Sequence, residues 1–120
     1  MTIRRFLSAR SQALLASLLV LICVPIQAAT LVYNASVGVV KIGVLPEYQG
    51  GVVLVTATKT VEGCETGYWI SAEAPGGDRA LSVLLSAKHT GALLSITADK
   101  DRRWTGSSGK YCHIHLIWQL

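Results

Sequence analysis

The stretch DRALSVLLSAKHTGALLSITA, residues 78–98, decides how the chain folds, because its hydrophobic pattern changes from a helical period to a strand period. Asp78 is a good N-cap residue, and Gly91 stands where a left-handed residue ends many helices. The pattern predicts a helix over residues 79–90, followed by a strand over residues 93–98. One face of this helix carries Leu81, Leu84, Leu85 and Lys88.

Strand patterns surround this helix on both sides. Val and Ile dominate residues 30–45, where Gly38 and Gly43 predict a bend or a bulge. Further strands are expected over residues 52–58, 68–72 and 111–120. The order of three strands, one helix and two strands is that of the OB-fold. The sequence therefore predicts a mainly β domain with one helix, built as a five-stranded, antiparallel, OB-fold-like barrel.

Alternation in the last expected strand predicts which of its side chains are buried. Successive strand residues point to opposite faces, so that every second residue belongs to one face. The more apolar of the two faces is the one expected in the core. Its residues are Cys112, Ile114, Leu116, Trp118 and Leu120.

The first 28 residues have the composition of a secretory signal peptide. Three arginines within the first ten residues precede an apolar run from Ala13 to Ile26, and small residues follow at Ala28 and Ala29. This run is shorter than the roughly 20 residues that a membrane span requires. We expect cleavage after Ala28, which leaves a single domain at residues 29–120 without a membrane anchor, in a secreted or periplasmic location.

Removal of the signal peptide changes the charge of the chain. The full sequence has 11 Lys and Arg residues and 7 Asp and Glu residues, and all charges of the first 28 residues are basic. The mature domain therefore has a net charge of about +1, which gives no basic surface for a polyanion. This near-neutral charge and the expected export both argue against nucleic acid as a partner, although single strands are common OB-fold ligands.

Two cysteines remain in the expected mature domain, Cys64 and Cys112. In an exported chain two cysteines are expected to form a disulfide. Because these cysteines are 48 residues apart, the closed loop is long, and the bond should stabilise the domain by roughly 4 kcal/mol. The alternative is a nucleophilic Cys112 assisted by His113. It is disfavoured because adjacent strand residues point to opposite faces.

One combination of these features resembles a known family. Cys64 lies in a glycine-flanked loop, the run Ala80–Ala87 is followed by Thr90-Gly91 and a strand, and a second cysteine comes late in the chain. Residues 64–118 thus resemble the small exported OB-fold proteins that include the receptor-binding B subunits of subtilase-cytotoxin-like and pertussis-like toxins. The resemblance implies an exported binding module, with a glycan as its ligand and a homo-oligomer as one form of assembly.

The loops that carry ligands in OB-folds contain four candidate binding residues. The loop joining strands one and two contains Tyr48, and the loop joining strands four and five contains Arg102, Arg103 and Trp104. An exposed indole beside a guanidinium suits a sugar ring with an acidic substituent, because Arg can grip a carboxylate with two parallel hydrogen bonds. The alternative is that Trp104 folds back into the core, as most Trp residues do, and leaves both arginines solvated.

Metal and catalytic sites receive little support from the sequence. His113 and His115 share one strand face and could reach one metal ion, but a zinc site needs at least one more ligand, and we expect neither a metal nor a cofactor. The chain has no glycine-rich phosphate loop and no nucleophile elbow. The sequence predicts a non-enzymatic module that binds a glycan. The alternative is a periplasmic structural or inhibitory protein that binds a protein partner.

Overall fold

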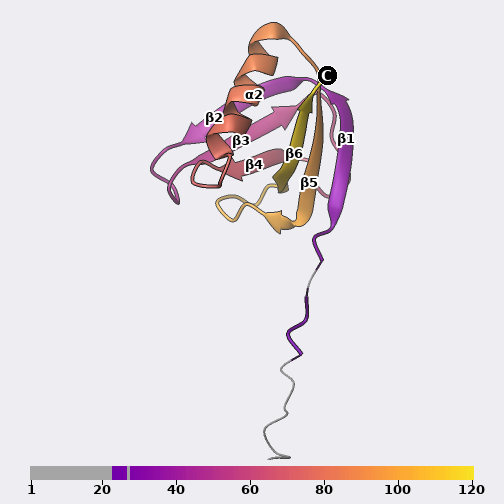
Figure 1. Ribbon diagram of the computed structural model, residues 1–120, viewed down its shortest axis with the longest axis vertical. Helices are drawn as coiled ribbons and strands as arrows, with labels where there is room; N and C mark the ends of the chain where they lie inside the picture. Colours follow the sequence, from indigo (N-terminus) through magenta and orange to yellow (C-terminus); the bar gives the residue numbers. More distant parts are fainter. Residues whose placement is uncertain (1–22, 27) are drawn as a thin grey trace, which may run out of the picture.

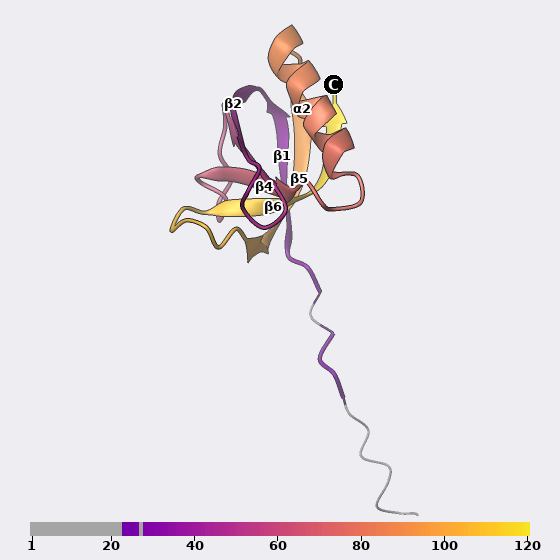
Figure 2. The same ribbon diagram turned by 90° about the vertical axis from the view of Figure 1, so that its left-hand side faces the viewer.

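The computed structural model describes residues 23–26 and 28–120, and most of the expected signal peptide lies outside the described residues. The described part is mainly β with one helix, and Figures 1 and 2 show α2 at one end of the sheet, opposite the end from which the chain enters β1. The elements are β1 (Leu31–Val37), β2 (Val39–Leu45), β3 (Val52–Ala57), β4 (Gly67–Ser71), α2 (Gly77–Thr90), β5 (Leu94–Arg103) and β6 (Tyr111–Gln119). No helix among the described residues is long and apolar enough to cross a membrane.

The strands form one six-stranded sheet in the order β1-β5-β6-β4-β3-β2, which is not closed into a barrel. Neighbouring strands are antiparallel, except that β4 and β6 run parallel. The expectation of five antiparallel strands is therefore wrong in the number of strands and in this one pairing. The parallel pairing arises because α2 and β5 separate β4 from β6, so that β6 returns beside β4 in the same direction.

The sixth strand arises from a break in the region expected to be one long strand. Ser36 has a left-handed backbone with φ of 54°, and the register with β5 shifts between Asn34 and Val37. Gly38 then separates β1 from β2, and its N–H donates a hydrogen bond of 2.9 Å to the Thr58 hydroxyl. The two halves consequently pair with different neighbours, β1 with β5 and β2 with β3.

The helix confirms one expected end and corrects the other. Gly91 ends it in a left-handed conformation with φ of 72°, as expected. The helix begins at Gly77, however, and its N-cap is Gly76, so that Asp78 lies in the first turn without capping it. Leu84 and Ala87 are fully buried in the core, whereas Leu85 is exposed. The buried face is therefore narrower than the sequence pattern indicates.

A bulge in β6 overturns part of the expected core. Ala98 lies opposite Ile114, but the preceding Thr97 lies opposite Leu116, so that His115 is an extra residue on β6. Cys112 and Ile114 are buried as expected. Beyond the bulge the faces are exchanged: Leu116 is 42% exposed, Trp118 is 60% exposed and Leu120 is exposed as well. The expectation that these three residues belong to the core is wrong.

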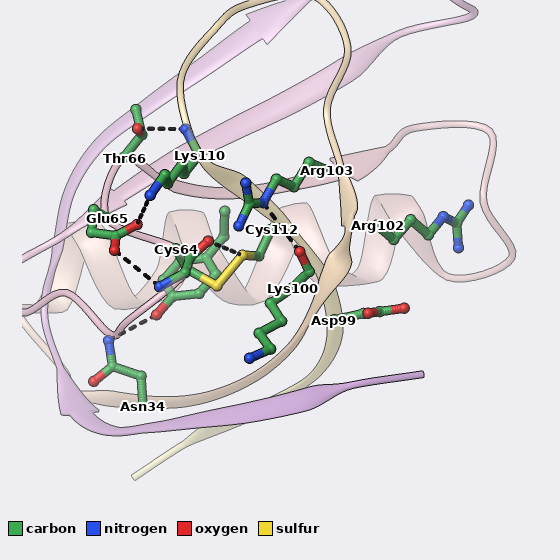
Figure 3. The surroundings of a disulfide bond; sticks show 12 residues. Asn34, Cys64, Glu65, Thr66, Asp99, Lys100, Arg102, Arg103, Lys110 and Cys112 are labelled. Carbon is green, nitrogen blue, oxygen red and sulfur yellow. Dashed lines mark hydrogen bonds and ion pairs between the residues drawn. A yellow bond between two sulfur atoms is a disulfide. The ribbon is translucent and has the colours of Figure 1, made fainter. Parts of the chain in front are cut away.

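The disulfide between Cys64 and Cys112 is present, as expected from the two cysteines. Both cysteines are buried, and the bond joins the loop before β4 to the start of β6 (Figure 3). Three contacts hold the same strand ends together: Lys110 N–H donates to the Thr66 hydroxyl at 2.7 Å, Thr66 N–H donates to the Lys110 carbonyl at 3.3 Å, and Lys110 Nζ lies 3.7 Å from the Glu65 carboxylate. The parallel pairing of β4 and β6 is thereby fixed at its beginning.

A buried polar pair lies near this disulfide in the core. The Asn34 amide donates hydrogen bonds to the Tyr68 hydroxyl at 2.8 Å and to the Lys59 carbonyl at 3.0 Å. Burial raises the pKa of the Tyr68 phenol, so that this group stays protonated. Asn34 lies in a glycosylation sequon, but its side chain is used inside the fold.

We expect Leu84→Ala to lower the free energy of unfolding by about 2–5 kcal/mol, because it removes a fully buried side chain. Leu116→Ala should cost about 1 kcal/mol or less, because the bulge places Leu116 on the exposed face. Urea denaturation of both variants checks this ranking. An equal or larger loss for Leu116→Ala would contradict the exchange of faces at His115.

Candidate functional site

A second bulge, in β5, carries Arg102 onto the outer face of the sheet. Asp99 lies opposite His113 and Arg103 lies opposite Cys112, so that residues 100–102 have no counterpart on β6. The guanidinium carbon of Arg102 lies 5.7 Å from the centroid of the Trp69 ring, and the Arg102 carbonyl accepts a 3.1 Å hydrogen bond from the Trp69 indole N–H. The bulge therefore holds Trp69 through both the side chain and the backbone of Arg102.

The parallel pairing of β4 and β6 places Trp69 beside His113. These two residues are register partners, and their rings meet edge to face at a centroid distance of 4.8 Å. The preceding residues, Tyr68 and Cys112, are also partners and point into the core. One pair of strands thus supplies a buried polar contact on one face and an aromatic pair on the other.

A pocket of about 670 Å³ lies beside this aromatic pair, where β4 ends and β6 continues past it. Its polar lining includes Glu73, Asp99, Arg102, His113 and His115. A second pocket of about 630 Å³ shares Asp99 and Arg102 with it. We call these two pockets together with Trp69 the Arg102 site. Within the part of the chain that the structure describes, Arg102 makes no ion pair, so that its guanidinium is available to a ligand.

His113 is held in its neutral form at this site. Burial lowers the pKa of the imidazole below its ordinary value of 6.5, and the Arg102 guanidinium lowers it further. Asp99 acts in the opposite direction, and His115 adds a smaller lowering effect. His113 Nε2 is buried and has no hydrogen-bond partner among the described residues. A neutral imidazole has one donor and one acceptor nitrogen, and the buried Nε2 is not open to a ligand in this structure.

The structure brings only some of the residues expected from the loops together. Tyr48 and Trp104 meet edge to face at a centroid distance of 5.6 Å, and Tyr111 packs on Trp104 in the same manner at 5.8 Å. Trp104 is only 7% exposed. This agrees with the alternative interpretation, in which Trp104 folds back into the protein interior. It offers no open ring face for a sugar to stack on.

The two arginines of the loop point in different directions. Figure 3 shows Asp99 and Arg102 pointing to the same side, away from the disulfide, whereas Arg103 points toward the disulfide. Arg103 Nε donates a 3.2 Å hydrogen bond to the Lys100 carbonyl. Of the four expected residues, Arg102 alone belongs to the pocket beside Trp69, and the sequence interpretation did not include Trp69 at all.

Trp69 was missed because the local pattern does not say which face of a short strand is buried. Tyr68 and Trp69 are both large and aromatic, and only the pairing with β6 assigns one to the core and the other to the outer face. In the sequence, His113 and His115 are candidate metal ligands and His113 is a candidate partner of a nucleophilic Cys112, but neither residue is assigned to a ligand pocket. In the described residues no three His, Cys, Asp or Glu side chains are grouped so as to hold a metal ion.

A scan against protein-family models and a search of curated proteins find no match to this chain. These comparisons therefore add no support to the resemblance to toxin B subunits.

We expect the stability of the protein to fall as the pH drops below about 6.5, because the unfolded state then binds a proton at His113 that the folded state resists. His113→Gln should remove part of this loss, since the amide does not titrate. The check is the free energy of unfolding in urea at pH 7.5 and pH 5, with His115→Gln as the control. A His113→Gln variant with the same pH dependence as wild type would show that His113 is not the group responsible.

Proposed function

We propose that this protein is an exported, non-enzymatic binding domain, and that its ligand is a glycan with an acidic group bound at the Arg102 site. The observation that carries the proposal is the Arg102 guanidinium, 5.7 Å from the Trp69 ring centroid, at a pocket of about 670 Å³. This volume lies within the usual range of small-ligand sites. A guanidinium can bind a carboxylate through two parallel hydrogen bonds, and its contact with the Trp69 ring holds the guanidinium in place at the pocket.

The strand order supports an OB-like architecture for this domain. β1 and β2 are separated only by Gly38 and occupy the two ends of the strand order, so that they act as two halves of one bent first strand. With this count there are five strands, and α2 lies between the third and the fourth. Ligands of OB-folds commonly contact the loop between the last two strands, and Arg102 is the penultimate residue of β5, directly before that loop.

Export is supported by the disulfide and by the signal-peptide pattern. A buried Cys64–Cys112 bond is typical of proteins that fold in an oxidising compartment. Cleavage after Ala28 would release a domain that begins two residues before β1. The periplasm and the cell exterior are both oxidising compartments of this kind.

A protein partner is a second candidate ligand, favoured by a different surface. Tyr33 lies opposite Thr97 and Thr97 lies opposite Leu116, so that Tyr33 and Leu116 share one face of the sheet. Trp118 lies two residues further along β6 and is more than half exposed. Exposed aromatic residues of this kind often contribute most of the binding energy at protein interfaces. A structural or inhibitory protein, or a second copy of this chain, would use this face.

We expect the wild-type protein to bind carboxylated glycans on an array that also presents neutral ones. Arg102→Gln should lower that binding by about tenfold or more, because a charge-assisted hydrogen bond is lost. Arg103→Gln is the matched control, since Arg103 is the neighbouring residue and points toward the disulfide (Figure 3). Both variants should keep the melting temperature of wild type.

Two results of this experiment would contradict the proposal. One is a folded wild type that binds no glycan on the array, and the other is a loss of binding in Arg103→Gln but not in Arg102→Gln. Trp104→Ala serves as a reference for loss of binding through loss of folding. It should lower the free energy of unfolding by about 3–5 kcal/mol, because Trp104 is buried.

A further inference from the structure

Ala29 lines both pockets of the Arg102 site. The pocket of about 670 Å³ and the pocket of about 630 Å³ share Ala29, Asp99 and Arg102. The chain next to Ala29 is tied to the bulge of β5, because Lys100 N–H donates a 3.1 Å hydrogen bond to the Thr30 carbonyl. Leu31 is then paired with Asp99 in the sheet. The position of Ala29 is therefore set by the same bulge that positions Arg102.

We propose that cleavage after Ala28 completes the Arg102 site, because the new α-amino group of Ala29 becomes a ligand-binding cation beside Arg102. The inference rests on the proposed export and glycan binding. In the uncleaved chain the Ala29 nitrogen belongs to an uncharged peptide bond, and Ala28 forms part of the wall of the second pocket. Cleavage removes Ala28 from this wall and leaves Ala29 as the terminal residue of the lining. It also leaves an amino group that is mostly protonated at neutral pH.

The charges of the site explain why a second cation matters. Among the described residues that line it, the carboxylates are Glu73, Asp99 and Asp101, and the one permanent cation is Arg102. His113 and His115 also line it, and His113 is held neutral by burial. An acidic ligand would therefore meet an excess of negative charge in the uncleaved chain. The α-ammonium group reduces this excess and offers a second donor to the ligand's carboxylate.

A ligand-independent measurement tests where the amino terminus lies. The protein is collected after export, its amino groups are labelled by ¹³C-dimethylation, and the pKa of the α-amino group is followed by NMR. Asp99→Asn should lower this pKa by about 0.5, since it removes a nearby negative charge. Asp78→Asn on α2 lies outside both pockets and is the matched control. An α-amino pKa that is the same in wild type and Asp99→Asn would overturn the proposal.

Binding tests the role of the amino group toward the ligand. Insertion of Gly-Ser between Ala28 and Ala29 moves the new terminus by up to about 7 Å and leaves every residue of the domain in place. On the same glycan array, the extended protein should bind carboxylated glycans about tenfold more weakly than the protein that begins at Ala29. Equal binding by the two forms would overturn the ligand-binding role. Binding of no carboxylated glycan by either form would instead refute the proposed function, and with it this role.

Discussion

The parallel pairing of β4 with β6, fixed by the Cys64–Cys112 disulfide, is the constraint on which both faces of the sheet depend. It joins two segments that are 48 residues apart at the cysteines, which local interactions alone would not bring together. On the inner face it places Tyr68 next to Cys112, where the Tyr68 hydroxyl receives a hydrogen bond from Asn34. On the outer face it places Trp69 against His113. A shift of one residue in this pairing would exchange the core with the candidate site.

Two bulges in the β5–β6 pair then decide what the outer face presents. The extra residue in β6, His115, turns Leu116 and Trp118 outward and creates an uncharged aromatic surface. The longer bulge in β5 brings Arg102 over Trp69 and leaves Asp99 beside it at the pocket. The polar pocket and the apolar surface therefore lie on the same pair of strands, one on each side of the bulge at His115. This arrangement separates the site that we propose for an acidic saccharide from the surface that we propose for a protein partner.

The sequence predicts those features that depend on residues close together in the chain. The helix, its end at Gly91 and most strand positions follow from hydrophobic period and turn residues. The disulfide joins distant residues, and it is predictable because the expected mature domain has two cysteines. The bulges do not follow, because alternation assumes an uninterrupted strand ladder, and for that reason Leu116 was assigned to the core. Arg102 could be identified from its loop. Trp69 could not, because its face is set by β6, which lies far away in the sequence.

The three indole N–H groups of Trp69, Trp104 and Trp118 report on the pocket, the buried aromatic cluster and the apolar face separately, in one NMR spectrum. Titration with a carboxylated glycan selected on the array tests most directly whether the outer face beside Arg102 is the binding site. We expect the Trp69 signal to move with saturation, because this N–H is bonded to the Arg102 carbonyl, and the other two signals to stay in place. Movement of the Trp118 or Trp104 signal with a fixed Trp69 signal would contradict binding at the Arg102 site.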